Sequence, residues 1–333
     1  MKKIINILLI IVITSLVLYL SLKDNFSAII NQILNMNIIW LVVAFLFLII
    51  YWILRTNAIH TFIKMMNKKQ KYSNSLLLML RTQFVNAVTP FATGGQPYQI
   101  YYLKKCGISL TDSTVIIVEN FIVYQIALVT LGLIALFSNL IFHVFKDNPL
   151  LSHLIAIGFF MNTLVIVVLF IVSFGKKLNK KLISIGITVL TKLRIVKDRQ
   201  AKLDKWNEKI NQFHTSASWL LKHKKKFIFT IIYNFIALIF LYLIPLIILF
   251  AMGKYNAINA LEVIVTSAYV MLIGSFVPIP GGSGGLEYGF IAFYGNFISG
   301  SILSAVMLVW RFITYYFGMI VGAIAFYIKR VKS

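Results

Sequence analysis

Two clusters of glycine and proline interrupt stretches of the chain that are otherwise apolar. One cluster reads TPFATGGQPY, at residues 89–98, and the other reads VPIPGGSGGLEY, at residues 277–288. Backbone inside a bilayer is expected to form unbroken helix, and breaks are tolerated where protein or a water-filled cavity covers the freed NH and C=O groups. Paired breaks of this kind are typical of substrate sites in membrane transporters.

Composition identifies the class of protein in which these breaks occur. Of 333 residues, 60% are apolar and 12% are charged, whereas a soluble domain has about 25% charged residues. We therefore predict an all-α integral membrane protein with a single transmembrane domain over residues 1–333. The lone Cys106 excludes a disulfide framework and the five histidines lack metal-ligand spacing, so we expect no metal and no cofactor.

The apolar segments predict about six membrane-spanning helices and two re-entrant hairpins with broken tips. The spanning helices are expected at about 4–22, 37–54, 111–138, 151–174, 227–250 and 301–328. We interpret the first as a retained helix, since no cleavage site follows it. The hairpins are expected at about 73–103 and 257–297.

The charge distribution orients this topology. Nearly all of the 32 Lys and Arg residues fall on the side of the N-terminus, and the exceptions are Lys23, Lys146 and Lys254 on the other side, with Arg81 and Arg311 inside membrane segments. This bias predicts cytoplasmic N- and C-termini. Contact with anionic inner-leaflet lipids accounts for the net charge of +23, so no nucleic-acid partner is expected.

The stretch at 175–226 is too polar to span a membrane. We predict a basic cytoplasmic connector there. The apolar residues that recur in it at helical spacing are Leu203, Trp206, Ile210 and Phe213. Such a pattern is typical of an amphipathic helix on the inner leaflet, although a plain connecting helix has the same pattern.

An internal repeat links the two glycine clusters. At an offset of 190, the residues Gly94, Gly95 and Tyr98 coincide with Gly284, Gly285 and Tyr288, and after a slip of one residue Phe121, Ile122 and Tyr124 coincide with Phe312, Ile313 and Tyr315. Three predicted spans separate the hairpins, so the second copy is inverted. We therefore predict an inverted-topology repeat with halves at about 73–174 and 257–328.

Glycines that merely allow close helix packing are the alternative interpretation. Prolines accompany both clusters, and proline breaks a helix rather than thinning it. These prolines are Pro90, Pro97, Pro278 and Pro280.

Four ionisable residues lie within predicted membrane segments, where a charge persists only if it is paired or faces a polar cavity. They are Arg81, Glu119, Glu287 and Arg311. We hypothesise that the arginines contact a phosphate, that the glutamates contact a cationic headgroup, and that NH groups at the breaks add anion contacts. A buried structural ion pair is the alternative.

The remaining predicted substrate-binding residues belong to the breaks or to the polar face of the helix after each break. They are Gly94, Gly95, Gln96, Tyr98, Asn120, Tyr124, Gly281, Gly282, Gly284, Gly285, Tyr288 and Tyr315. No catalytic residue is predicted. The GGSGG segment lacks the Lys-Ser or Lys-Thr of a phosphate-binding loop, which disfavours ATP-driven transport.

Four segments together resemble the lysylphosphatidylglycerol synthase/flippase membrane-domain family over nearly the whole chain: GGQPYQIYYLKKCGIS, VIIVENF, VPIPGGSGGLEYGF and WRFITYYFGMIVG. The resemblance implies the flippase region of the multiple peptide resistance factors of bacterial cell membranes. These move aminoacylated phosphatidylglycerol from the inner to the outer leaflet and so confer resistance to cationic antimicrobial peptides. The family commonly has Arg after the Glu of the first repeat, where this chain has Asn120, so Arg311 is the better phosphate ligand.

Full-length members of that group append a soluble aminoacyl-transfer domain. This chain ends at Ser333, directly after its last predicted helix, so we expect no lysyl transfer, and a separate lipid-modifying synthase is a candidate partner. Two alternatives stay open: an ion-coupled transporter of a glycolipid or small solute, and a membrane enzyme that carries the name phosphatidylglycerol lysyltransferase by family alone. The sequence also leaves open the headgroup of the substrate lipid, the energy source of transport and the oligomeric state, which could be a homo-oligomer.

Overall fold

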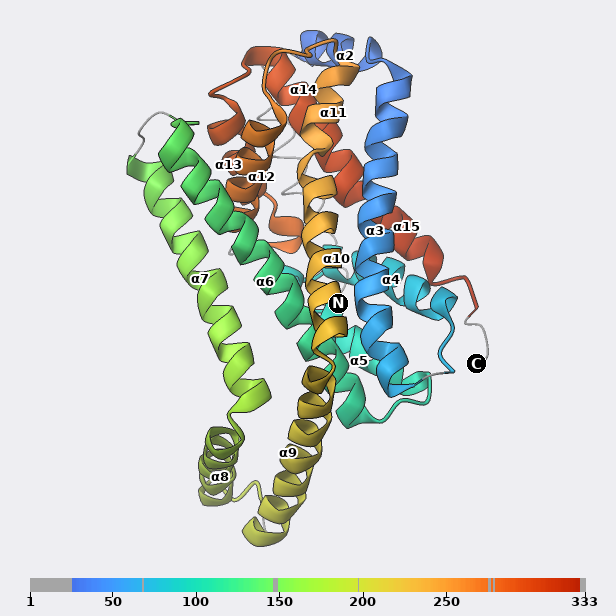
Figure 1. The fold of residues 1–333 in the computed structure, drawn as a ribbon, viewed down its shortest axis with the longest axis vertical. Coiled ribbons are helices and arrows are strands. Elements are labelled where there is room, and N and C mark those ends of the chain that lie inside the picture. Colours follow the sequence, from blue (N-terminus) through green and yellow to red (C-terminus); the bar gives the residue numbers. More distant parts are fainter. Residues whose placement is uncertain are drawn as a thin grey trace.

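The computed structural model describes residues 26–67, 69–145, 149–196, 198–274, 277 and 279–329. The predicted first helix at 4–22 lies outside these ranges. All regular secondary structure in the described ranges is helical, as the all-α prediction requires. The helices form an elongated bundle, and α8 and α9 extend from one end of it (Figure 1).

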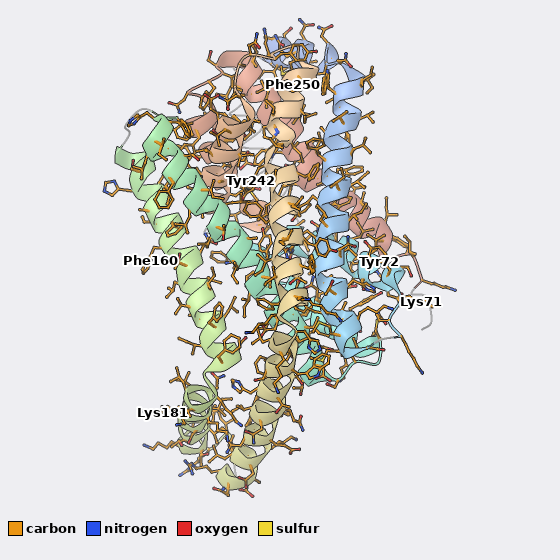
Figure 2. All side chains as sticks on the ribbon, in the orientation of Figure 1. Lys71, Tyr72, Phe160, Lys181, Tyr242 and Phe250 are labelled. Atoms are coloured by element: carbon orange, nitrogen blue, oxygen red, sulfur yellow. The ribbon has the colours of Figure 1, made fainter. Side chains whose placement is uncertain are left out.

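Five helical segments of the described chain are long and apolar enough to cross a membrane. They are α3 (Ile38–Met66), α6 (Leu110–Phe142), α7 (Pro149–Phe174), α10 with α11 (Lys224–Tyr242 and Ile244–Ala251), and α14 to α15 (Gly300–Arg311 and Gly318–Ala325). They correspond to five of the six predicted spans. Their outer faces are apolar: Phe160 of α7 points away from the bundle and is 63% exposed, as expected for a side chain that contacts lipid (Figure 2).

Two units with a helix, a break and a second helix occur where the hairpins were predicted. The first consists of α4 (Tyr72–Ala87), the single turn η1 (Pro90–Ala92) and α5 (Gly95–Lys105), and the second of α12 (Ala260–Gly274), η2 (Pro280–Gly282) and α13 (Gly285–Tyr294). The turns η1 and η2 pack against each other, and η2 also contacts α4. In Figure 1, α5 lies toward the end that carries α8 and α9, whereas α12 and α13 lie toward the opposite end.

The backbone of the turns η1 and η2 matches at an offset of 190 residues, and it diverges just after them, where Gly284 is left-handed (φ 87°) and Gly94 is not (φ −73°). Both turns begin with a proline, and the next two residues are left-handed in each case: Phe91 (φ 52°) and Ala92 (φ 53°) in η1, and Gly281 (φ 69°) and Gly282 (φ 63°) in η2. Glycine adopts this region without a steric penalty, whereas a residue with a Cβ atom is strained there. The left-handed backbone is therefore strained at Phe91 and Ala92 in the first break, whereas glycine adopts it without strain in the second.

The last spanning segment differs from the continuous helix predicted at 301–328. The α-helix stops at Arg311, residues Phe312–Phe317 form a π-helical segment, η3, and α15 ends at Ala325. A π-segment inserts extra backbone into a helix and changes the direction of the side chains that follow, and it is frequent at functional sites. Here it begins directly after Arg311 and contains Tyr315.

Helix α3 continues twelve residues beyond the end predicted for that span at residue 54. Apolar side chains recur at helical spacing after Arg55, and Ala58, Ile59, Phe62 and Ile63 are fully buried. The helix continues because its apolar pattern continues past the first charged residue, at which the predicted span ended. Arg55 therefore lies in the interior of a continuous helix that is long and apolar enough to cross a membrane.

The basic connector forms a hairpin of α8 (Lys176–Lys192) and α9 (Arg199–Lys222), with Lys181 near the tip of the molecule (Figure 2). Ser216 of α9 donates a hydrogen bond to Asp112 Oδ1 at the start of α6, at 2.7 Å. Ile210 of the predicted amphipathic stripe is buried. The exposed apolar stripe lies on α8 instead, at Leu182, Ile185, Val189 and Leu193.

Candidate functional site

A cavity of about 530 Å³ lies where the two breaks meet. Side chains of α3, α4, α6, α12 and η3 line it together with both breaks. Its volume falls in the usual range for ligand pockets, about 300–1,000 Å³. Eight predicted site residues line this cavity: Gly95, Gln96, Asn120, Tyr124, Gly281, Gly282, Arg311 and Tyr315.

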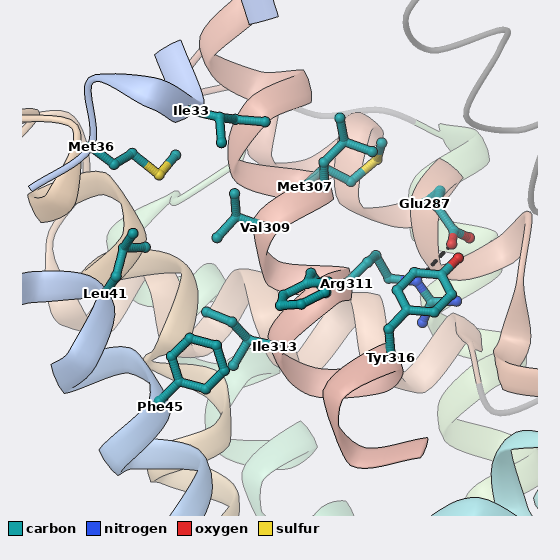
Figure 3. Close-up of a pocket in the computed structure, with 12 residues that line it drawn as sticks. Ile33, Met36, Leu41, Phe45, Glu287, Met307, Val309, Arg311, Ile313 and Tyr316 are labelled. Carbon is teal, nitrogen blue, oxygen red and sulfur yellow. Dashed lines mark ion pairs between the residues drawn. The ribbon is translucent and has the colours of Figure 1, made fainter. Parts of the chain in front are cut away.

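Arg311 connects the last spanning segment to the second break. Its Nε lies 2.7 Å from Oε1 of Glu287, an ion pair without the angle of a hydrogen bond. Its NH2 group donates to the carbonyl of Gly281 at 3.0 Å and to the Ser283 hydroxyl at 3.3 Å. Glu287 also accepts from the NH of Gly284 at 2.7 Å, so one carboxylate both caps α13 and neutralises the arginine (Figure 3).

Tyr315 joins the two breaks directly. Its hydroxyl donates to the carbonyl of Ala87, the last residue of α4, at 3.0 Å. Its ring covers Gly281 so closely that a Cβ atom there would lie 2.3 Å from Tyr315 Cε2. Glycine is therefore required at 281 for two reasons: its positive φ and the contact with the ring. The guanidinium of Arg311 lies 4.7 Å from the centre of the same ring.

Arg55 is a second cation in the cavity lining. Its guanidinium carbon lies 4.0 Å from the centre of the Tyr124 ring, and its NH1 group donates to Oδ1 of Asn234. No ion pair joins it to an acidic residue in the part of the chain that the structure describes. Sequence reasoning missed this residue, although the helical spacing of the apolar residues after it indicates that the helix continues past it.

Neutral polar side chains make up much of the remaining lining. The amides are Gln83, Asn86, Gln96, Gln99, Asn120, Gln125 and Asn162. The Oδ1 atoms of Asn86 and Asn120 are buried and make no hydrogen bond within the described structure. A buried acceptor without a partner costs about 1–3 kcal/mol, so these atoms are typical of a site that takes up water or a ligand.

Arg81 lies away from the cavity. Its Nε donates to the carbonyl of Ala325 at 3.0 Å, and its NH2 group donates to the carbonyl of Ile328 at 2.6 Å. Ala325 is the last residue of α15, where helix carbonyls lack partners within the helix, and Ile328 lies three residues beyond it. The observed contacts of Arg81 thus hold α4 against α15.

The other predicted residues outside the cavity surround the breaks. Tyr98 packs against Phe326, Gly94 contacts Thr89, and Tyr288 is half exposed. Gly284 and Gly285 form the start of α13. These positions shape the helices that carry the cavity without lining it.

Glu119 is completely buried on α6 and faces Ser173 of α7. Neither carboxyl oxygen makes a hydrogen bond of standard geometry within the described structure. The next residue, Asn120, lines the cavity, whereas Glu119 does not. The two side chains therefore leave α6 in different directions, Asn120 toward the cavity and Glu119 toward α7. The buried ion pair considered as the alternative is therefore observed between Arg311 and Glu287, and no ion pair joins Glu119 to an arginine among the described residues.

The region that contains these features matches a known family. The family described as "Lysylphosphatidylglycerol synthase TM region" matches residues 5–322, which include both breaks and all cavity-lining residues. The chain belongs to this family. A UPF0104 membrane protein of Archaeoglobus fulgidus is similar, with 26% identity over 303 residues that cover 89% of this chain and 88% of the relative.

In this member of the lysylphosphatidylglycerol synthase TM family, a second pocket of about 460 Å³ adjoins the ion pair. Its lining is apolar except near Arg311 and Glu287, as Figure 3 shows. Among the lining residues are Ile33, Met36, Leu41, Phe45, Met307 and Ile313. Arg311 lines both pockets, so it lies between a polar compartment and an apolar one.

Proposed function

We propose that this protein is a flippase-like lipid transporter, in which the central cavity takes the polar headgroup of a phospholipid while the acyl chains stay in apolar surroundings. One observation carries the proposal: Arg311 lines a polar cavity on one side and an apolar pocket on the other. An amphiphile needs such adjoining compartments, whereas a small polar solute needs only the first.

The transport mechanism that we propose is alternating access by an inverted repeat. The halves are the segments at about 73–174 and 257–328, with the two broken hairpins entering the membrane from opposite sides and meeting near its middle. Three observations support it: the pair of left-handed residues after a proline in both turns, at an offset of 190, the contact between η1 and η2, and the lengthwise separation of α5 from α12 and α13 (Figure 1).

In this proposal Arg55 and Arg311 bind the lipid phosphate. Arginine donates several hydrogen bonds from a planar group and suits phosphate oxygens. Tyr315 contacts both breaks, and a change in either break is therefore transmitted to the other. Arg81 keeps α15 on α4 and supports the site without contacting the lipid.

The family description makes lysylphosphatidylglycerol the first lipid to test, with export from the inner to the outer leaflet of the cell membrane. A separate synthase would supply it. The α8–α9 hairpin fits a cytoplasmic membrane surface, because the exposed apolar stripe of α8 is flanked by Lys177 and Lys181. Such a helix binds anionic lipid through both apolar burial and charge.

The test uses purified protein in vesicles that contain a trace of acyl-labelled lipid, either phosphatidylglycerol or lysylphosphatidylglycerol. A membrane-impermeant quencher reports the label in the outer leaflet over time. We expect faster exchange than in protein-free vesicles, and we expect Arg311→Ala to slow it about 10- to 100-fold, since a charge-assisted hydrogen bond contributes about 1.5–3 kcal/mol. Lys202→Gln, on the exposed face of α9, is the matched control for loss of one positive charge.

Exchange at the protein-free rate for both lipids would overturn the proposal. Exchange that Arg311→Ala leaves unchanged, in protein with an unaltered size-exclusion profile, would remove this residue from the mechanism. Arg311→Lys separates charge from geometry, because lysine keeps the charge but cannot reach Gly281, Ser283 and Glu287 together.

A second function, proton-coupled transport, is favoured by Glu119. Glu119 is fully buried, with Ser173 beside it and no cation partner in the described part of the chain, and such a carboxylate is costly unless it takes up a proton. If a proton drives transport, a pH gradient will accelerate net lipid movement in vesicles with the native protein, and Glu119→Gln will abolish that acceleration. A rate of net lipid movement that is the same with and without the pH gradient excludes proton coupling.

A further inference from the structure

The charged groups that line the central cavity are all positive in the described part of the chain. Arg55 and Arg311 line it, and the lining includes no Asp or Glu. Glu287 touches Arg311 from the neighbouring pocket, and its other oxygen accepts the NH of Gly284. One arginine is thus balanced and the other is not, which leaves about one positive charge for a ligand to neutralise.

Two of the tyrosine rings that line the cavity already carry a guanidinium group. The Arg55 guanidinium covers the Tyr124 ring at 4.0 Å, and that of Arg311 covers the Tyr315 ring at 4.7 Å. An ammonium group in the cavity would have neither a free carboxylate nor either of these ring faces, and it would approach two guanidinium groups. Such an environment disfavours a cationic headgroup.

The uncharged lining favours a ligand that carries hydrogen-bond donors, and the two arginines in the lining favour neutral hydroxyl groups over ammonium groups as those donors. The Oδ1 atoms of Asn86 and Asn120 are buried acceptors without a partner, and an acceptor can be satisfied only by a donor. A phosphodiester has no donor, whereas a hydroxyl both donates and accepts. Amide side chains also have both functions, so the amides of the lining match neighbouring hydroxyl groups in either direction.

We infer that the headgroup bound in this cavity is a phosphodiester with one negative charge and free hydroxyl groups, as in a phosphatidylglycerol or a phosphatidylinositol, and that the aminoacylated form is disfavoured. This inference rests on the proposed function and specifies its substrate class. A lysyl ester adds two ammonium groups and makes the headgroup cationic. The cavity therefore selects the unmodified lipid over its lysylated derivative.

A binding experiment tests the headgroup without requiring transport. The apparent melting temperature of the purified full chain is measured in detergent micelles with equal mole fractions of phosphatidylglycerol, phosphatidylinositol, phosphatidylethanolamine or lysylphosphatidylglycerol. We expect the first two lipids to raise it and the two ammonium-bearing lipids to raise it less. Equal shifts, or a larger shift with lysylphosphatidylglycerol, overturn the inference.

Transport in vesicles gives the second measurement. We expect phosphatidylglycerol to exchange at least about tenfold faster than lysylphosphatidylglycerol, which corresponds to about 1.4 kcal/mol. Faster exchange of the lysylated lipid overturns the inference and leaves the proposed flippase function intact. Exchange at the protein-free rate for every lipid overturns the proposed function, and the melting experiment then decides the headgroup preference by itself.

Two substitutions test directly whether the charge of the cavity lining determines the headgroup preference. Arg55→Gln removes the unbalanced cation, so the preference for phosphatidylglycerol should fall at least about tenfold, whereas Arg55→Lys should keep most of it and Lys202→Gln all of it. Asn120→Asp places a carboxylate in the lining with little change of volume, so it should shift the preference toward lysylphosphatidylglycerol. An unchanged preference in both Arg55→Gln and Asn120→Asp contradicts the proposed basis of selection.

Discussion

Replacing Glu287 by glutamine tests whether the buried ion pair stabilises the junction of the last span and the second break. The side chains of Arg311 and Glu287 are 5% and 10% exposed, so water screens them little. Two opposite charges about 4 Å apart attract by about 4 kcal/mol at an effective dielectric constant of about 20. Removal of one partner of a buried pair costs about 3–5 kcal/mol in practice, and we expect a loss of this size in Glu287→Gln.

The assay is reversible unfolding in mixed micelles, followed by tryptophan fluorescence, for both single variants and the double variant Glu287→Gln/Arg311→Met. Since the double variant leaves no unpaired charge, its loss of stability should be at least about 2 kcal/mol smaller than the sum of the single losses. A coupling energy below about 0.5 kcal/mol would refute the reasoning.

Glu262→Gln is the matched control for this prediction. Glu262 has the same capping role at the start of α12, where its Oε2 accepts the NH of Asn259 at 2.8 Å. It lacks an arginine partner within the described residues. The expected loss is therefore that of a cap alone, about 0.5–2 kcal/mol. If Glu262→Gln loses as much stability as Glu287→Gln, the loss in Glu287→Gln is explained by the cap and not by the ion pair.

Three further predictions concern other parts of the structure. Gly322→Ala should destabilise the protein by about 1–3 kcal/mol, because the new Cβ atom would lie 2.6 Å from the backbone nitrogen of Phe84; an unchanged unfolding midpoint would contradict the close contact of α15 with α4. Tyr315→Phe leaves the Ala87 carbonyl without its donor and should cost about 1–3 kcal/mol, measured as above; a neutral result would show that the two breaks are not linked by this bond. Burial, with Lys176 and Lys180 nearby, lowers the pKa of His214 in α9, so the folded state binds this proton less readily than the unfolded state. Stability is then complete above the unfolded pKa of about 6.5 and falls as the pH drops below it, and His214→Gln should remove part of that loss in unfolding experiments at pH 5–7.

The sequence was sufficient for the class of protein, for five spans within the described residues and for both helix breaks. These features depend on local chemistry. A long apolar segment has to cross hydrocarbon as a helix, and a proline such as Pro90 or Pro280 cannot lie in a helix interior without breaking or kinking it. The residues that line the cavity from the breaks, such as Gly95 and Gly281, were predictable for the same reason.

Tertiary structure alone decided which charged side chains share the cavity. Arg55 lines the cavity whereas Arg81 binds the end of α15, and Glu119 faces α7 rather than an arginine. Each outcome depends on how a helix is rotated about its axis against its neighbours. In apolar helices that rotation is weakly encoded, since side chains are hydrophobic all round. The π-segment after Arg311 adds a local change of register that 3.6-residue periodicity does not contain.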